Sequence, residues 1–251
     1  KKDHEPKIKK IIKQNLDGLL KISKERLIDE LKKIFLSFNF INISKDEFSI
    51  EVLNLIFPEL VKIKILKKFS TEMFNLLSEK DFIFLLSLFI IDNTDNSDYF
   101  LYKYRLSNYD KNRINLLKKN YANIFDKKFL SEKNLMQLYY HYGKMFIIDL
   151  IDLKILNSKS INKSDVNLRN YLLKKEKPIF PVKAKKLIEE FNLREGKKLG
   201  EKLKKLEKIW INNDFKLSEK EIKQISKNEI YFTSVISKFL IPDGVFTSTK
   251  S

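Results

Sequence analysis

Cysteine and histidine, two residue types that often act as nucleophile or base, are absent or rare in this 251-residue chain. Cysteine is absent, which excludes thiolate nucleophiles, disulfides and thiolate metal sites. The two histidines, His4 and His141, lie far apart, so we expect neither a histidine-rich metal site nor a Ser-His-Asp triad, although His141 alone could serve as a base. Asp149 and Asp152 are one helical turn apart, which is the wrong setting for a metal-binding carboxylate pair. These residues predict no catalytic site.

The stretch from Arg194 to Gly200 carries residues suited to binding phosphate. Gly196 is expected to relieve the backbone where a helix begins, and Gly200 would let another element approach that helix closely. The free N–H groups at the helix start, with Arg194, Lys197 and Lys198 nearby, would hold an anion. An ordinary helix start with a small residue at a packing contact explains Gly200 equally well, but not the local excess of basic residues.

The chain carries 50 Lys and Arg against 33 Asp and Glu, for a formal net charge of +17. Only five of the basic residues are Arg, and the abundance of Asn, Ile, Phe and Tyr is typical of AT-rich codons, so part of the lysine reflects composition. The remaining charge would attract RNA, DNA or an acidic membrane surface. An RNA-binding protein would gather lysines on one face, whereas compositional drift would scatter them. Membrane binding would need an unburied apolar helix face, and we expect the apolar stripes to be used in packing.

Apolar residues recur at helical spacing along almost the whole chain, and five Gly and five Pro leave few breaks. We therefore predict an all-α fold, an elongated multi-helix array with no substantial sheet. Ser23 is expected to cap one helix, and Ser44 with Glu47 another that ends at Pro58. The remaining helices are expected over 5–20, 61–69, 71–77, 79–91, 97–106, 109–118, 120–125, 131–142, 144–156, 164–174, 183–191, 197–212 and 218–226.

Two prolines between Lys174 and Pro181 predict an extended linker. No apolar run reaches the ~20 residues that span a bilayer, and the longest, residues 82–91, is expected to be a buried core helix. Because the first residue is Lys and no targeting signal is visible, we expect a piece of a longer protein and a cytoplasmic location. The last residues, Ile241–Ser251, are expected to fray.

Three further segments carry charged or aromatic groups that could contact a partner. In residues 22–31, Arg26 and Glu30 are expected to pair at i,i+4, with a solvated charged face as the plain alternative. After a cap at Ser107 or Asn108, Lys111 and Arg113 are expected to project outward, although an ordinary capped helix explains the same residues. The run 139–142, Tyr-Tyr-His-Tyr, could stack bases, but more often such a run is core with an amphipathic edge.

Together these segments resemble the C-terminal, non-catalytic part of the bacterial class II tRNA nucleotidyltransferase/poly(A) polymerase family, the CCA-adding enzymes. Residues 22–31, ISKERLIDEL, are similar to the family's I-S-x-E-R-I-x-x-E-L motif, and Phe57-Pro58-Glu59-Leu60 to its L-P-E-L. Residues 105–116 resemble R-L-S-N-A-E-x-x-R-L, and residues 138–149 resemble L-L-Y-R-x-G…D. The tail is similar from Phe180 to Ser218, although Ala184 stands where the family often has Gly and residues 192–195 replace a Gly/Pro-rich loop.

The resemblance implies helical neck, body and tail segments at 1–60, 61–175 and 176–251, which together grip the acceptor and T arms of tRNA. In the family, a separate catalytic head carries a Gly-Gly turn, a D-x-D pair that holds two Mg²⁺, and an E-D-x-x-R motif that reads ATP or CTP. This sequence contains no Gly-Gly and no D-x-D. We therefore expect no cofactor here and no activity from this chain alone.

The residues that the resemblance and the charge pattern single out fall into two groups. Head bracing is expected from Ser23, Glu25, Arg26 and Glu30. RNA binding is expected from Lys111, Arg113, Lys118, Lys119, Lys183, Lys185, Lys186, Arg194, Gly196, Lys197, Lys198 and Gly200. The leading hypothesis is the tRNA-binding part of a CCA-adding nucleotidyltransferase. The alternatives are a poly(A) polymerase of the same family, or a non-enzymatic basic helical RNA-binding or adaptor protein.

Overall fold

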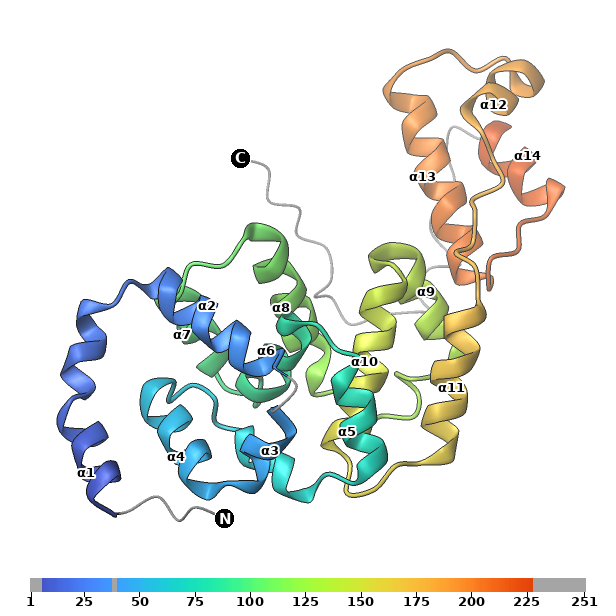
Figure 1. Cartoon of the computed structure of the whole chain (residues 1–251). Helices are drawn as coiled ribbons and strands as arrows, with labels where there is room; N and C mark the ends of the chain where they lie inside the picture. Colours follow the sequence, from blue (N-terminus) through green and yellow to red (C-terminus); the bar gives the residue numbers. More distant parts are fainter. Residues whose placement is uncertain (1–5, 38–39, 228–251) are drawn as a thin grey trace. The chain divides into compact units, whose positions relative to one another are not determined.

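The computed structural model describes residues 6–37 and 40–227. Within these two ranges every regular element is a helix and no strand occurs (Figure 1). The prediction of an all-α helical array is therefore confirmed. His4 and the C-terminal residues 241–251 lie outside the described residues.

The chain divides into two compact units, Lys1–Lys177 and Pro178–Ser251. The division falls within the segment where two prolines predict a linker. The first unit contains α1 (Pro6–Gln14), the 3-10 helix η1 (Leu16–Lys21), α2 (Lys24–Phe35), α3 (Phe40–Lys45), α4 (Glu47–Ile56), the 3-10 helix η2 (Ile63–Lys68), α5 (Thr71–Ser78), α6 (Phe82–Ile90), α7 (Asn96–Lys103), α8 (Asn108–Tyr121), α9 (Glu132–Tyr142), α10 (Lys144–Asn157) and α11 (Lys163–Lys174). The second contains α12 (Ala184–Phe191), α13 (Lys197–Asn212) and α14 (Glu219–Lys227).

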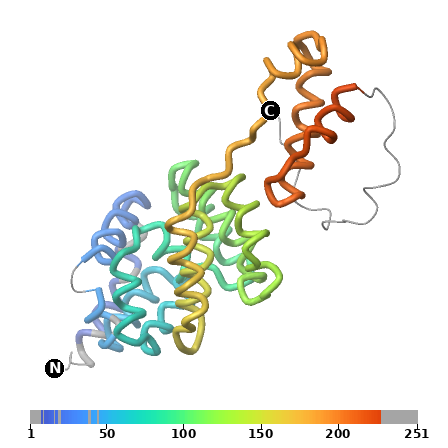
Figure 2. The backbone as a smooth tube through the Cα atoms, turned by 90° about the vertical axis from the view of Figure 1, so that its right-hand side faces the viewer, coloured from blue at the N-terminus to red at the C-terminus, as the bar shows by residue number. Residues whose placement is uncertain are grey.

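The core of the first unit forms around α6 and α10. Every residue of α6 is buried, as expected for its uninterrupted apolar run. α6 packs against α2, α7 and α8, while α10 packs against α8, α9 and α11. α10 and α11 run side by side in both ribbon and tube views (Figures 1 and 2). One continuous apolar core extends from Leu27 to Leu172. It contains residues of both the predicted neck segment, 1–60, and the predicted body segment, 61–175.

Side-chain caps start most of these helices, because the first N–H groups of a helix lack partners inside it. Ser23 caps α2 by accepting a hydrogen bond from the Arg26 N–H at 3.2 Å, and Ser107 caps α8 in the same way. Both of these predicted caps are confirmed. The predicted capping box at Ser44 is wrong, because Ser44 lies inside α3 and Asp46 caps α4 through the Ser49 N–H at 3.1 Å.

Helix boundaries differ from the predictions at other places too, three of which change how the chain is divided into helices or the type of helix. The helix expected over 5–20 is broken into α1 and the tighter η1, with Asn15 between them. The segment predicted as 61–69 forms the 3-10 helix η2. The helices predicted over 109–118 and 120–125 are one helix, α8, followed by a turn. α4 ends at Ile56, as expected from Pro58.

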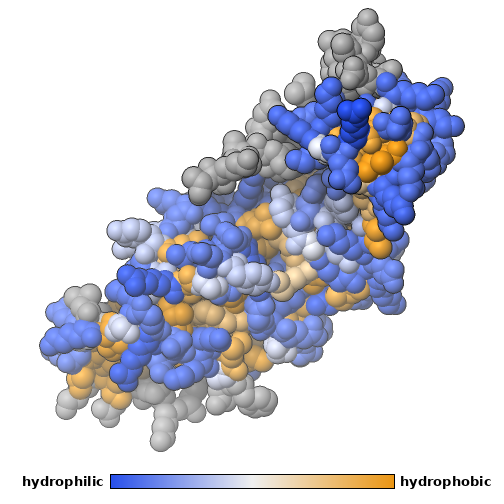
Figure 3. All heavy atoms as spheres, turned by 90° about the horizontal axis from the view of Figure 1, so that it is seen from above, coloured by the Kyte–Doolittle hydropathy of each residue, from blue (hydrophilic) through white to orange (hydrophobic). Residues whose placement is uncertain are grey.

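The second unit builds a small core of its own. Leu187 of α12, Leu199 and Leu206 of α13, and Ile222 of α14 form its buried centre. Trp210 is buried beside this core, with ring centroids 5.4 Å from Phe180 and 4.9 Å from Phe215. The part of this unit that faces the viewer in Figure 3 is covered mainly by hydrophilic side chains, with apolar side chains gathered at one place.

Candidate nucleic-acid interface

Lysines gather on the solvent side of α13. The buried side of this helix carries Leu199, Leu206 and Trp210. With 3.6 residues per turn, positions 197, 201, 204 and 208 fall on the opposite side, flanked by 198 and 205. Five of these six positions are lysine, and all of them are exposed. We call Lys197, Lys198, Lys204, Lys205 and Lys208 the lysine face of α13; Glu201 is the acidic residue that shares this side.

Five exposed lysines on one helix would suit a polyanion such as RNA. Lys202, by contrast, belongs to the interior of the unit, since its ammonium group donates to the carbonyls of Ile225 and Ser226 at 3.0 and 2.7 Å. Lys197 and Lys198 are among the residues predicted to bind RNA, whereas Lys204, Lys205 and Lys208 are not. Lys204, Lys205 and Lys208 could have been found from the sequence, because helical spacing places them away from the apolar residues of the same helix.

The start of α13 has the backbone that its glycine predicts. Gly196 has φ of +134°, a conformation that residues with a side chain rarely adopt, and it makes no side-chain capping bond. Arg194 is exposed just before it. The expectation that Gly200 marks a close approach is wrong, because an added Cβ would meet none of the described atoms within 4 Å.

The basic residues predicted around α12 divide into exposed and paired groups. Lys183 is exposed at the start of α12. Lys185 is 3.7 Å from Glu189. Lys186 is 3.0 Å from Glu219 of α14 and 4.0 Å from Glu190, and the hydrogen bond that it donates to Glu219 raises the pKa of Lys186. Lys186 therefore links α12 to α14, and part of its charge is compensated within the unit.

In α8 the expectation that Arg113 projects outward is wrong. Its side chain is only 10% exposed. Its guanidinium is 2.6 Å from Asp81 at the start of α6 and 2.8 Å from Asp149 in α10. This arginine therefore joins three helices, and it is not placed to bind RNA.

Lys118 is also engaged within the unit, since its ammonium group is 2.5 Å from Asp98 of α7. Lys111 is half-buried and Lys119 is exposed. Of the four basic residues predicted to bind RNA from α8, Arg113 and Lys118 are thus held in internal ion pairs.

The two aspartates of α10 both accept bonds from buried cations. Burial raises the pKa of Asp149 to about 6, although Arg113 acts to lower it. Asp152 is fully buried and contacts Lys80 as well as the Arg169 Nε, the latter at 2.7 Å. Both carboxylates thus hold helices together. The described residues contain no group of acidic and histidine side chains that could hold a metal ion.

The residues predicted to brace a catalytic head lie at the start of α2. Glu25, Arg26 and Glu30 are exposed, while Leu27 and Leu31 are buried on the other side. The predicted pair between Arg26 and Glu30 is replaced by a hydrogen bond from Lys33 to Glu30 at 2.8 Å. This bond lowers the pKa of Glu30, with a smaller contribution from Arg26.

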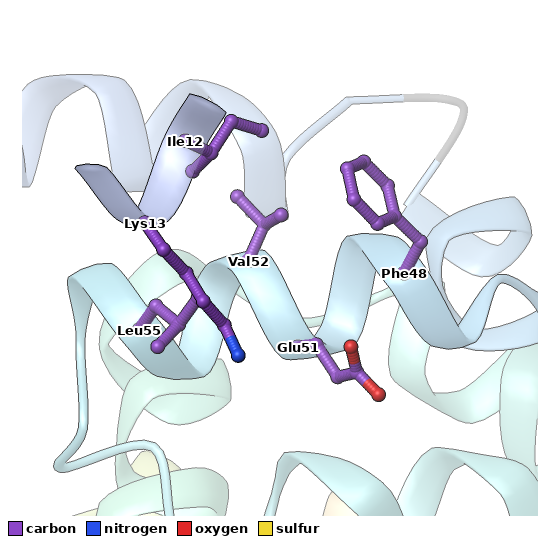
Figure 4. A pocket seen from close by; sticks show the side chains of 6 residues that line it. All are labelled: Ile12, Lys13, Phe48, Glu51, Val52 and Leu55. Atoms are coloured by element: carbon purple, nitrogen blue, oxygen red, sulfur yellow. The ribbon is translucent and has the colours of Figure 1, made fainter. Parts of the chain in front are cut away.

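α1 and α4 leave apolar surface exposed. Ile8 and Ile11 are 40% and 50% exposed, and Leu55 is 38% exposed. Between the two helices a small pocket is lined by Ile12, Lys13, Phe48, Glu51, Val52 and Leu55 (Figure 4). The expectation that every apolar stripe is used in packing is therefore wrong for α1. No helix among the described residues has the length and apolar character needed to cross a membrane.

The aromatic run 139–142 is mainly packing. Tyr139 is buried and its hydroxyl donates to the Lys175 carbonyl at 3.4 Å. Tyr142 packs edge-on against Phe146, with ring centroids 5.2 Å apart. His141 is exposed and contacts its two tyrosine neighbours. These contacts favour the interpretation of residues 139–142 as core with an exposed edge over a role in base stacking.

Comparison with known proteins gives one positive finding. Residues 4–64 match the family model described as "Probable RNA and SrmB- binding site of polymerase A". This segment is similar to an RNA-binding region of the poly(A) polymerase family. No curated protein and no solved structure matches the chain.

The matched segment has a defined place in the fold. It runs from the region of α1 into η2, and so it includes the head-bracing candidates of α2 and the α1–α4 pocket. The lysine face of α13 lies outside it. The family match indicates RNA, and the lysine face, in the other unit, independently indicates a polyanion.

Proposed function

We propose that this chain is the tRNA-binding portion of a template-independent RNA nucleotidyltransferase that adds CCA to tRNA 3′ ends, and that its lysine-rich helices bind the acceptor and T arms. The observation that carries the proposal is the lysine face of α13, where five exposed lysines lie opposite the buried side of one helix. The match of residues 4–64 to an RNA-binding region of polymerase A supports an RNA partner.

The chemistry of the lysine face suits an RNA backbone better than RNA bases. Lysine presents a compact charge that pairs with phosphate without reading sequence, whereas arginine more often forms two-pronged contacts with bases. Two of the five arginines, Arg113 and Arg169, are held in internal ion pairs. An enzyme that processes many tRNAs must recognise shape and phosphate, because the sequence differs from one tRNA to the next and the deep major groove of an A-form duplex hides its base edges.

The surface of α1 and α4 supports a second part of the proposal. The exposed Ile8, Ile11 and Leu55 give this region an apolar area that a neighbouring domain would bury. We place the catalytic head of the family against it and against the exposed start of α2. The head would supply Mg²⁺ and the ATP or CTP site, and the residues described here would orient the tRNA.

A poly(A) polymerase of the same family is the second candidate, because the matching family model is described by polymerase A. In both candidate functions, CCA addition and poly(A) synthesis, ATP or CTP would bind to the catalytic head and not to the residues described here. Full-length protein incubated with tRNA lacking CCA distinguishes the two enzymes: addition that stops after three residues supports CCA addition, and a long homopolymer supports poly(A) synthesis.

Replacing Lys197, Lys204 and Lys208 together by alanine should weaken binding to tRNA lacking CCA by at least about tenfold and lower the slope of log affinity against log salt by about 3. Each lysine that binds a phosphate releases about one counterion, so the fall in slope measures how many of the three lysines bind phosphate in the parent protein. Fluorescence anisotropy over a series of salt concentrations measures both quantities.

The matched control removes the same charge from another side of the second unit. Lys216, Lys220 and Lys223 are exposed on α14 and the turn before it. Their alanine variant should retain the salt slope of the parent within about 1. If both triple variants lose affinity equally, RNA binding reflects total charge, and the lysine face is not the binding surface.

A further inference from the structure

Three tyrosines on α7 and the start of α8 are turned to solvent. Tyr102 is 88% exposed, Tyr109 66% and Tyr99 57%. Tyr102 lies on the side of α7 opposite the fully buried Phe100, and Tyr99 lies about one turn before Tyr102. Tyr109 follows in the first turn of α8. Three large rings within eleven residues are thus placed away from the core.

These rings contribute little to the fold. Among the described residues, Tyr102 and Tyr109 make no side-chain hydrogen bond and no ring contact, and the contact of Tyr99 is with the Lys103 ammonium group 5.9 Å from its ring centroid. Tyr104, in the same segment, is by contrast buried and packs against Phe57 and Phe100. The exposed rings therefore remain available to a ligand.

The charges around the tyrosines favour a polyanion. Arg105 is exposed between Tyr102 and Tyr109, and its guanidinium has no ion pair in the described part of the chain. Nearby acids are compensated: Asp98 by Lys118 at 2.5 Å, and Glu59 by Lys103 at 2.7 Å. Of the other two acids, Asp110 accepts from the Ser107 hydroxyl at 2.7 Å, and Asp95 is exposed where α7 begins. Lys111 adds a second basic residue.

We infer that this tyrosine surface, consisting of Tyr99, Tyr102, Arg105 and Tyr109, binds the unpaired bases of single-stranded RNA by stacking. Aromatic rings stack on any base, and a guanidinium beside them adds charge and a second planar stacking group. Paired bases are closed to such rings because they are stacked on each other within the duplex. The inference rests on the proposed function in that the chain binds RNA, but it uses a different surface from the lysine face.

Replacing Tyr99 and Tyr102 together by alanine should lower affinity for a single-stranded RNA of about 12 nucleotides by at least about tenfold. Affinity for a blunt RNA duplex of the same length should not change, and the salt slope should stay constant because no charge is removed. The corresponding double phenylalanine variant keeps the rings and should retain most of the affinity. Phe125→Ala removes a ring that is 53% exposed beyond the far end of α8, and it should have no effect.

Three outcomes overturn this inference. Unchanged affinity of the alanine variant for single-stranded RNA is one, and an equal loss for single-stranded and duplex RNA is another. The third is a changed oligomeric state in sedimentation without a change in RNA affinity, which would make the tyrosine surface a protein contact. Failure of the proposed function would give a different result. The lysine-face variant would then bind tRNA with the affinity of the parent, while the tyrosine variant would still have a lower affinity for single-stranded RNA.

Discussion

Asp152→Ala is expected to lower the free energy of unfolding of the first unit by about 3–5 kcal/mol. Asp152 is fully buried in α10 and accepts bonds from Lys80 and Arg169, whose side chains are 9% and 16% exposed. Removing the carboxylate leaves the Lys80 cation inside the protein without its buried ion-pair partner, and it leaves Arg169 with only the exposed Glu79. Urea unfolding followed by far-UV circular dichroism measures the loss.

Glu79 provides the matched control for this variant. It contacts the same Arg169 at 3.3 Å but is 63% exposed, so Glu79→Ala should cost no more than about 1 kcal/mol. A combined Asp152→Leu, Lys80→Met and Arg169→Met variant removes all three charges together and should recover much of the stability. An Asp152→Ala protein as stable as the parent would show that the ion cluster does not hold α10 and α11 together.

Trp210→Ala is expected to destabilise the second unit by about 3–5 kcal/mol. Trp210 is 3% exposed and lies between Phe180 and Phe215, so its removal leaves a cavity in a unit with few buried residues. Circular dichroism is the suitable probe, since Trp210 is the only tryptophan of the chain.

Trp210→Phe is the control for the tryptophan variant, because it keeps an aromatic ring in the same place and loses less volume. Its loss of stability should be clearly smaller than that of Trp210→Ala. Equal losses from both substitutions would mean that the site needs the indole itself rather than a filled cavity. A Trp210→Ala protein with the stability of the parent would contradict the placement of this side chain in the core.

Local patterns in the sequence predict most of the helices. The apolar run at 82–90 predicts the buried α6, and Ser23 and Ser107 predict two helix starts, because periodicity and capping act within a few residues. Ser44 fails as a cap since Asp46, two residues later, offers a carboxylate to the same turn. The break between α1 and η1 could not be predicted, because Asn15 is neither Pro nor Gly. The nearest Gly, Gly18, lies within the 3-10 helix that follows.

The candidate site could be predicted only where it depends on one helix. Helical spacing alone places Lys197, Lys204 and Lys208 opposite the buried side of α13. Arg113 could not be assigned this way, because its partners Asp81 and Asp149 come from other helices, more than thirty residues away in sequence. Spacing shows which residues share a face, but it does not show which face a neighbouring helix covers.

The most direct test of tRNA binding by this chain is a competition experiment that compares tRNA with an RNA of another shape. The chain is bound to fluorescent tRNA lacking CCA, and unlabelled tRNA or a hairpin of equal length competes over a series of salt concentrations. We predict that tRNA competes at least about tenfold better than the hairpin, and that this preference persists as the affinity of both RNAs falls with salt. Equal competition by both RNAs at every salt concentration would contradict this prediction, because the chain would then bind RNA only as a polycation.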